Sequence, residues 1–200
     1  LRDFKLSGAE LGDTDKARFK AVQEALADLS TQFEEHLLDA ENAWAHYVDD
    51  AATLAGVPDD VLAEARAAAQ AEGRTGHKLT LRMPSYLPVM QYAHDRGLRR
   101  LMHEAFSTRA SDLTAHPEWD NAPLVARILE LRREAALLLG YGNFAQVSLV
   151  PKMAGSPDEV IAFLRDLARR AKPFAERDFG ELAAFARDEL GLAELMPWDV

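Results

Sequence analysis

The feature that most constrains the fold is a long helical pattern near the start of the chain. From Asp13 or Thr14, either of which can cap a helix, apolar residues recur every three or four positions. They are Val22, Leu26, Leu29, Phe33, Leu37 and Ala40. This helical period lasts for about seven turns. The pattern predicts a long amphipathic helix and favours a mainly α fold.

Two short runs depart from this period and favour strands. Trp44 to Val48 contains aromatic and β-branched residues and ends at Asp49 and Asp50. His77 to Leu81 alternates between the two faces of a strand. Because a strand needs a partner and no other run resembles one, we expect these two to pair. The sequence thus predicts a multi-helix unit with a small two-stranded β element.

Prolines, glycines and small polar residues place the ends of the shorter helices. Pro58 fits the first position of an alanine-rich helix that Gly73 closes in the left-handed conformation. Ser85 is expected to cap the next helix, with Pro88 in its first turn, where a missing N–H costs nothing. Three more helices are expected: one packing through Leu98, Leu101, Met102, Ala105 and Phe106, one from Leu124 to Leu139 that stops at Gly140, and a brief one capped by Asn143.

The clearest helix start is Ser156, which is followed by Pro157 and, three residues on, by Glu159. The serine hydroxyl can accept from the Glu159 N–H while the carboxylate reaches back, and proline suits the first helical position. This helix should stop at Gly191. Pro173 lies inside it and removes one backbone hydrogen bond, so we expect a kink or break at Lys172 and Pro173.

No fixed repeat, low-complexity tract or long Gly/Ser linker divides the chain. We therefore expect a single helical section over residues 1–200, with any sub-boundary near the turn-rich link at 113–123. The first residue is Leu rather than Met, and Trp198 and Val200 are apolar where a natural tail is usually polar. These ends lead us to expect a piece of a longer protein.

Composition excludes several classes of partner. The formal net charge is −10 and the pI is near 5.1, with no basic stripe, which argues against nucleic acid or an anionic membrane surface as a partner. The sequence contains no run of about 18 apolar residues, so it gives no sign of a membrane span. The absence of cysteine excludes disulfides, thiolate metal sites and a cysteine nucleophile. A cytoplasmic location fits these observations.

The histidines do not form a recognisable metal site. A zincin helix needs two histidines four residues apart with a glutamate after the first, and the nearest approach is His103-Glu104, where Ser107 replaces the second histidine. None of the six histidines has a partner at helical metal spacing; they are His36, His46, His77, His94, His103 and His116. We therefore expect no metal ligands among these residues.

Other candidate sites have simpler explanations. Gly140-Tyr141-Gly142 lies at a helix end, which accounts for both glycines, and there is no nucleotide-binding motif. The acidic residues Glu34, Glu35, Asp39 and Glu41 suit a solvated helix face better than acid–base chemistry or calcium. The cations Arg99, Arg100 and Arg109 could grip a peptide carboxylate, but pairing with the abundant acids is favoured. We expect no catalytic and no cofactor-binding residue in this stretch.

Five blocks in order resemble one enzyme family. They are Phe4 to Gly8, Leu29 to Phe33 with Leu38 to Ala40, Pro84 to Met90, Ala105 to Asp112, and a last set made of Leu138 to Tyr141, Lys152 to Ala154 and Pro197 to Asp199. Together they resemble the thimet oligopeptidase and oligopeptidase A family of zinc metallopeptidases. The resemblance covers essentially the whole chain.

This resemblance implies a larger, bivalve-like helical metallopeptidase with a deep channel, in which a zinc-activated water cleaves short peptides. The family's zinc ligands and catalytic glutamate lie on an H-E-x-x-H helix beyond the stretch that ends like Trp198, so none maps onto this sequence. By position, these residues imply channel wall and part of a small sheet. Zinc is expected in the parent protein and not in this section, which by itself should be inactive.

A second class of function stays open. The chain could instead be a free-standing helical interaction module without catalysis. Leu137, Leu138 and Leu139 span roughly 200° of a helix, which one core face cannot cover, and Trp198 and Val200 also lack an evident cover.

If the chain is part of a larger enzyme, a layer that covers these residues is missing here. We therefore expect the isolated chain to self-associate or to bind a hydrophobic dye.

Overall fold

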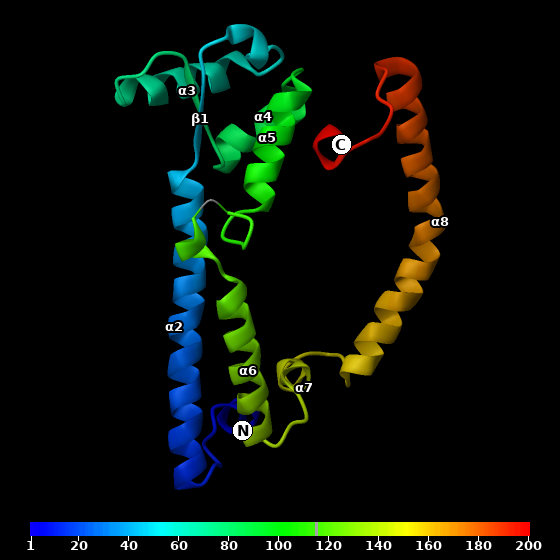
Figure 1. Ribbon diagram of the computed structural model, residues 1–200. Coiled ribbons are helices and arrows are strands. Elements are labelled where there is room, and N and C mark those ends of the chain that lie inside the picture. The colour runs from blue at the N-terminus through cyan, green and yellow to red at the C-terminus, as the bar shows by residue number, and fades with distance from the viewer. Residues whose placement is uncertain (115) are drawn as a thin grey trace. The chain divides into compact units, whose positions relative to one another are not determined.

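The computed structural model describes residues 1–114 and 116–200 and is mainly α-helical (Figure 1). The chain forms two compact units. Unit 1 consists of residues 1–32 and 123–194, and unit 2 consists of residues 33–122 and 195–200. The predicted mainly α fold is confirmed. The long helix α2, Asp13–Ala43, contributes its first part to unit 1 and its last part to unit 2.

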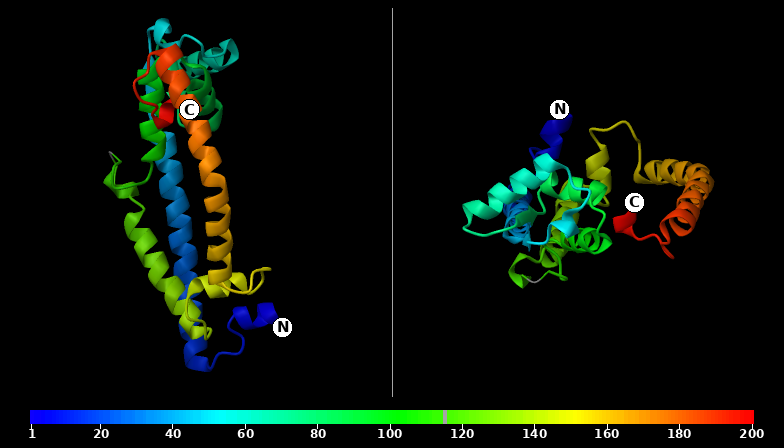
Figure 2. Two further views of the ribbon diagram at one scale, coloured as in Figure 1. Left: turned by 90° about the vertical axis from the view of Figure 1, so that its right-hand side faces the viewer. Right: turned by 90° about the horizontal axis from the view of Figure 1, so that it is seen from above.

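Unit 1 is built on two helices that lie side by side (Figures 1 and 2). These are the first part of α2 and helix α6, Ala122–Leu138. Phe19 and Val22 of α2 pack with Leu131 and Ala135 of α6 in a buried cluster. The unit also holds the short helices α1, Arg2–Leu6, and α7, Phe144–Leu149, whose predicted cap Asn143 accepts from the Gln146 N–H at 3.1 Å. Helix α2 begins at Asp13, so Asp13 and Thr14 lie in its first turn and neither is the residue that caps it.

Helix α8, Pro157–Leu190, shows how its ends and its proline are accommodated. Ser156 accepts from the Glu159 N–H at 3.1 Å as predicted, but the Glu159 carboxylate accepts from Gly155 at 2.7 Å rather than from the cap residue. The left-handed Gly191 ends the helix. Of the kink or break expected at Lys172 and Pro173, the break is absent, because α8 continues through these residues; the helix bends along its length (Figure 1).

Unit 2 contains the predicted ribbon. Strands β1, Ala45–Val48, and β2, His77–Thr80, are antiparallel, with Ala45 opposite Thr80 and Val48 opposite His77. Helices α3, Asp59–Ala71, α4, Met83–Tyr92, and α5, Arg96–Ser107, pack around it, with short 3₁₀ turns at Ala51–Leu54, Pro117–Trp119 and Pro197–Asp199. Its buried core comprises Val48, Leu54, Val57, Ala65, Leu79, Val89, Ala93, Leu98 and Met102.

Two predicted helix starts in unit 2 are wrong by one turn or less. Pro58 is the cap of α3 and not its first helical residue. Helix α4 begins at Met83, so Ser85 lies inside it and Pro88 lies beyond the first turn. The Ser85 hydroxyl is free for another role because it does not cap: it accepts from the Thr80 main-chain N–H at 3.0 Å. The predicted left-handed Gly73 after α3 is confirmed, with a φ of 70°.

Candidate functional site

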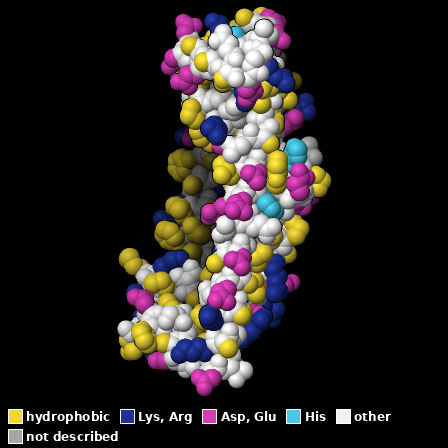
Figure 3. Space-filling model, turned by 90° about the vertical axis from the view of Figure 1, so that its left-hand side faces the viewer, with side chains coloured by type: hydrophobic (Ala, Val, Ile, Leu, Met, Phe, Trp, Pro, Cys, Tyr) yellow, Lys and Arg dark blue, Asp and Glu magenta, His cyan; other side chains and the backbone are white. Residues whose placement is uncertain are grey.

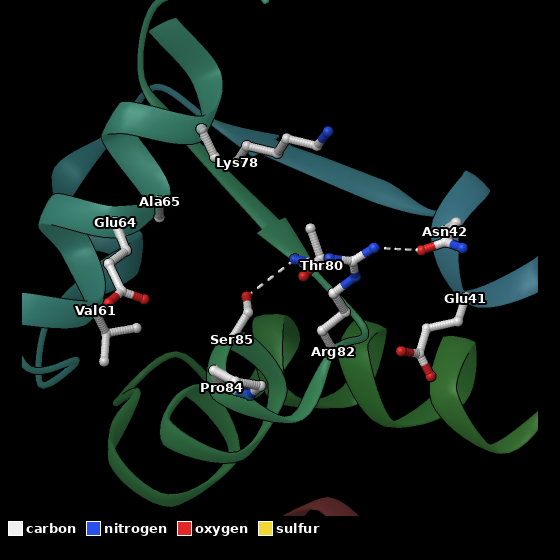
Figure 4. Close-up of a pocket in the computed structure, with 11 residues that line it drawn as sticks. Glu41, Asn42, Val61, Glu64, Ala65, Lys78, Thr80, Arg82, Pro84 and Ser85 are labelled. Atoms are coloured by element: carbon white, nitrogen blue, oxygen red, sulfur yellow. Dashed lines mark hydrogen bonds between the residues drawn. The ribbon is translucent and has the colours of Figure 1, made fainter. Parts of the chain in front are cut away.

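One pocket of unit 2 lies beside strand β2 (Figure 4). It has a volume of about 410 Å³ and is lined from four elements. Lys78 and Thr80 of β2 form one side, and Pro84 and Ser85 of α4 form the next. The remaining lining residues are Glu41 and Asn42 at the end of α2, Val61, Glu64, Ala65 and Ala68 of α3, and Arg82. This volume falls in the range of small-ligand sites.

The local sequence explains why these polar groups gather here. In β2, the side chains of His77 and Leu79 turn to the core, so Lys78 and Thr80 turn the other way. Ala65 of α3 is buried in the same core as Leu79. Glu64, one residue before Ala65, lines the pocket beside that core. The pocket is therefore a small polar hollow at the rim of an apolar core.

Most charges at the pocket are already paired. Arg82 donates to the Asn42 side chain at 2.7 Å (Figure 4). Glu41 accepts from Arg109 at 2.8 Å. The Lys78 ammonium donates to Glu72, and this hydrogen bond is the main reason that the Glu72 pKa lies below its ordinary value. Glu64 makes no hydrogen bond or ion pair with any residue in the described part of the chain. It is thus the carboxylate available to a ligand.

The acidic run predicted from the sequence is only partly brought to this pocket. Glu41 lines it, whereas Glu34, Glu35 and Asp39 are exposed on the surface of α2. Figure 3 displays acidic and basic side chains interspersed over one face of the molecule. No extended patch of one sign is visible on that face.

The three candidate arginines are occupied. Arg109 donates to Glu41 and also to the Phe106 carbonyl at 2.9 Å, and Arg100 donates to Glu104 at 2.7 Å. Arg99 donates to the Trp198 carbonyl at 2.9 Å and to Asp199 at 3.2 Å. Their roles in this structure are therefore to hold the unit together.

Asp199 is the most strongly perturbed carboxylate. Arg96 donates to it at 2.7 Å from Nη2, Arg99 adds a second contact, and only 1% of its side chain is exposed. The hydrogen bond from Arg96 is the largest cause that lowers its pKa to about 2. This clamp fixes the last residues of the chain onto α5, and the sequence did not suggest it because the partners lie about a hundred positions apart.

Three of the candidate histidines contact different residues of the protein. His103 lies 3.4 Å from the Ser107 hydroxyl and its ring packs near Trp198, His36 lies 3.0 Å from the Asn121 amide, and His77 is buried beside Arg66. Among residues 1–114 and 116–200, no three His, Cys, Asp or Glu side chains are grouped so that they could hold a metal ion. The described residues therefore do not fit a zinc centre.

Comparisons with known proteins place the chain. The sequence pattern of Peptidase family M3 matches residues 89–200, and the chain belongs to this family. It is 46% identical over 201 residues to an oligopeptidase A of Salmonella typhimurium and 41% identical to that of Haemophilus influenzae; each match covers 100% of this chain and 30% of the relative. A probable cytosolic oligopeptidase A of Arabidopsis thaliana is 36% identical over 212 residues, which cover 100% of this chain and 29% of that protein.

These matches confirm the family resemblance carried by the five blocks. The chain spans about 30% of the length of the curated relatives it matches. No helix in the described part of the chain is long and apolar enough to cross a membrane.

The sequence analysis did not identify the polar residues that line the pocket. Lys78, Thr80 and Ser85 carry no motif, and Glu64 is one of many acidic residues. The one available signal was the alternation in His77 to Leu81, which turns Lys78 and Thr80 to the same face.

Proposed function

We propose that this chain is a section of a zinc-dependent oligopeptidase that hydrolyses short peptides in the cytoplasm. In this proposal residues 1–200 form one section that supplies scaffold and channel wall, and the zinc site lies elsewhere in the polypeptide. The observation that carries it is the match along the whole chain to oligopeptidase A relatives, of which it covers only 30%. The described residues contain no group of three His, Cys, Asp or Glu side chains that could hold a metal ion, which supports a zinc site elsewhere in the polypeptide.

The test compares the complete reading frame with residues 1–200 alone. Both proteins are assayed with an internally quenched fluorescent peptide, before and after a zinc chelator, and their zinc content is measured. We expect chelator-sensitive hydrolysis and one bound zinc in the complete polypeptide, and neither in residues 1–200. Hydrolysis by residues 1–200 at a rate that follows the protein through purification would overturn the proposal.

A matched variant sharpens this test. His103 followed by Glu104 is the nearest approach to a zinc-binding pair, yet His103 contacts Ser107 and Trp198. His103→Ala in the complete polypeptide should therefore retain its zinc. Loss of zinc from a variant that keeps its far-ultraviolet circular dichroism would place a ligand in this section and contradict the proposal.

A second candidate is a non-catalytic helical interaction module. It is favoured by the exposed apolar side chains of α8, which include Phe163, Leu167, Phe174 and Phe185. If the protein is such a module, the complete polypeptide should bind no zinc and hydrolyse no peptide. The same experiment therefore separates the two candidate functions.

A further inference from the structure

Strand β2 has an outer edge that no other strand covers in the described residues. In an antiparallel pair, the residues facing each other alternate between pairs that exchange main-chain hydrogen bonds and pairs that do not. The Thr80 N–H donates to Ser85 and not to β1, so Thr80 and Ala45 form a pair of the second kind. Two residues earlier, Lys78 and Tyr47 must form another such pair.

The main chain of Lys78 therefore points away from β1, toward the outer edge. Within residues 1–114 and 116–200, no group forms a hydrogen bond with this outward N–H or C=O. Ser85 satisfies the neighbouring Thr80 N–H, which leaves one adjacent donor and acceptor on Lys78. This is the arrangement with which one residue of an added antiparallel strand exchanges two hydrogen bonds.

The pocket lies along this edge. Lys78, Thr80 and Ser85 all line it, and its volume of about 410 Å³ leaves space beside the strand (Figure 4). The opposite wall of α3 presents the small or apolar side chains of Val61 and Ala68, together with Glu64. Glu64 is the lining carboxylate without a partner among the described residues, so the wall favours a positive charge.

We propose that this pocket binds a short peptide in extended conformation, which adds to β2 as a third strand and places a Lys or Arg side chain against Glu64. The inference rests on the proposed function, because it makes the pocket a substrate subsite of a peptidase. One peptide residue exchanges both main-chain hydrogen bonds with Lys78. Its neighbour in the peptide turns to the opposite face, where α3 packs and Glu64 stands.

This geometry fixes the register of the peptide. The basic residue pairs with Glu64 through its side chain, and its own main-chain N–H points away from β2. The residues on either side of it have their N–H groups directed at β2. N-methylation of these neighbours should weaken binding, and N-methylation of the basic residue itself should be tolerated.

The first experiment measures binding of a labelled peptide to the 200-residue chain. The probe is the hexapeptide Val-Thr-Val-Lys-Val-Thr, amidated at its C-terminus and carrying fluorescein at its N-terminus, followed by fluorescence anisotropy. Methylation of the main-chain N–H groups of the two valines that flank the lysine should weaken binding about tenfold or more, since each methyl group removes a hydrogen bond to β2 and also clashes with the strand. Methylation of the lysine amide should change it less than about twofold.

Two protein variants test the same contacts from the other side. Lys78→Pro removes the outward N–H while the ladder bonds of His77 and Leu79 remain, and Lys78→Ala is its control because both lose the ammonium. We expect Lys78→Pro to bind at least about fivefold more weakly than Lys78→Ala, as for the loss of one hydrogen bond. If Lys78→Pro does not fold, the methylated peptides alone decide.

The charge contact has its own matched pair. Glu64→Gln should weaken the lysine peptide about threefold to fivefold, the size of a partly exposed ion pair. It should not weaken a peptide with norleucine in place of lysine. Glu34→Gln removes a carboxylate of unit 2 that is also exposed but lies outside the pocket, and it should change the affinity for neither peptide.

Failure of this inference is distinguishable from failure of the proposed function. The binding assay needs no hydrolysis, and hydrolysis by the complete polypeptide needs no information about this pocket. Equal affinities for the two methylated peptides, or no binding at millimolar peptide, would overturn the inference even if the complete polypeptide is a peptidase.

Discussion

Unit 2 and helix α8 of unit 1 use apolar residues in opposite ways. Unit 2 gathers nine buried residues from its strands, α3, α4, α5 and the loops between them into a single core. Helix α8 has 34 residues and buries only Ala186. Both segments show clear periodicity in the sequence. Periodicity in a sequence therefore identifies the face of a helix but not the partner that covers it.

The apolar face of α8 is regular despite its exposure. Phe163, Phe174 and Phe185 are spaced by eleven residues, which is close to three helical turns, so the three rings lie along one face. They are 65%, 60% and 56% exposed. The matched relatives are more than three times as long as this chain, so they contain further residues that are available to cover such a face.

The largest effect that distinguishes the two regions is expected from matched leucine substitutions. Leu79 is fully buried in unit 2, so Leu79→Ala should destabilise that unit by about 3 kcal/mol through lost burial and a residual cavity. Leu164 of α8 is 54% exposed, and Leu164→Ala should cost at most about 0.5 kcal/mol. Urea unfolding measures both.

Tryptophan fluorescence makes this measurement specific. The chain has three tryptophans, Trp44, Trp119 and Trp198, and all lie in unit 2. The urea concentration at the midpoint of the fluorescence transition should therefore be much lower for Leu79→Ala than for the wild type, and nearly unchanged for Leu164→Ala. Equal shifts would mean that α8 is as well packed in solution as the core of unit 2.

The next effect concerns the buried Asp199 clamp in unit 2. Its pKa is about 2 in the folded protein against an ordinary value of 3.8. The unfolded chain therefore takes up a proton first as the pH falls, so the contribution of the clamp is full above about pH 4 and is lost between 3.8 and 2. The shift corresponds to about 2 kcal/mol.

The pH dependence of unfolding tests the clamp. In the wild type, the free energy of unfolding reported by tryptophan fluorescence should decrease across this window, in addition to contributions from other acids. Asp199→Asn should be less stable at pH 7 and should lack this part of the decrease. Parallel pH profiles for the wild type and Asp199→Asn would show that the carboxylate is not held by the arginines in solution.

The elements of the fold were largely predictable because their signals are local. Several correct predictions depend on residues close in sequence or on simple elimination: the α2 periodicity, the pairing of β1 with β2, the Ser156 cap, the left-handed Gly73 and the helix end at Gly191. The sequence does not decide between a kink and a break at Pro173, and α8 stays continuous because a helix without a tightly packed neighbour can bend to accommodate a missing hydrogen bond.

The site was less predictable because it depends on contacts between distant residues. Glu64 differs from other acids of unit 2, such as Glu41 and Asp199, because those two pair with arginines from other elements. The sequence does not show which acids are paired in this way. Ser85 was assigned as a helix cap, and its bond to Thr80 requires the strand and helix to meet in space. Such pairings have no pattern in a single sequence.

Self-association should be smaller in energy than these effects and should depend on α8. The sequence placed the uncovered surface at Leu137 to Leu139 and near Trp198, but Leu138 and Leu139 pack against the unit 1 core. We now expect Phe163→Ser and Phe174→Ser each to weaken a dimer of residues 1–200 about tenfold, or about 1.4 kcal/mol, by removing apolar area from the interface. Sedimentation velocity over a concentration series measures this.

Leu137→Ser is the matched control for the self-association test. Leu137 is 55% exposed, but it lies on α6 and not on the face of α8. It should leave the dimer unchanged. A stronger effect from Leu137→Ser than from either phenylalanine would return the contact to the position suggested by the sequence.

The smallest expected effect comes from the polar contact that joins α2 and α6 in unit 1. Arg18 donates to Glu134 through two nitrogens, one of them at 2.7 Å, and this hydrogen bond lowers the Glu134 pKa. The two side chains are 51% and 35% exposed, so solvent screens the pair. A double-mutant cycle with Arg18→Gln and Glu134→Gln, followed by far-ultraviolet circular dichroism in urea, should give a coupling of about 0.5 kcal/mol that vanishes in 1 M salt. A coupling above about 1.5 kcal/mol that persists in salt would mean that the pair is desolvated. Unit 1 would then contain a buried polar fastening comparable with the Asp199 clamp, and the contrast between the two units would be confined to α8.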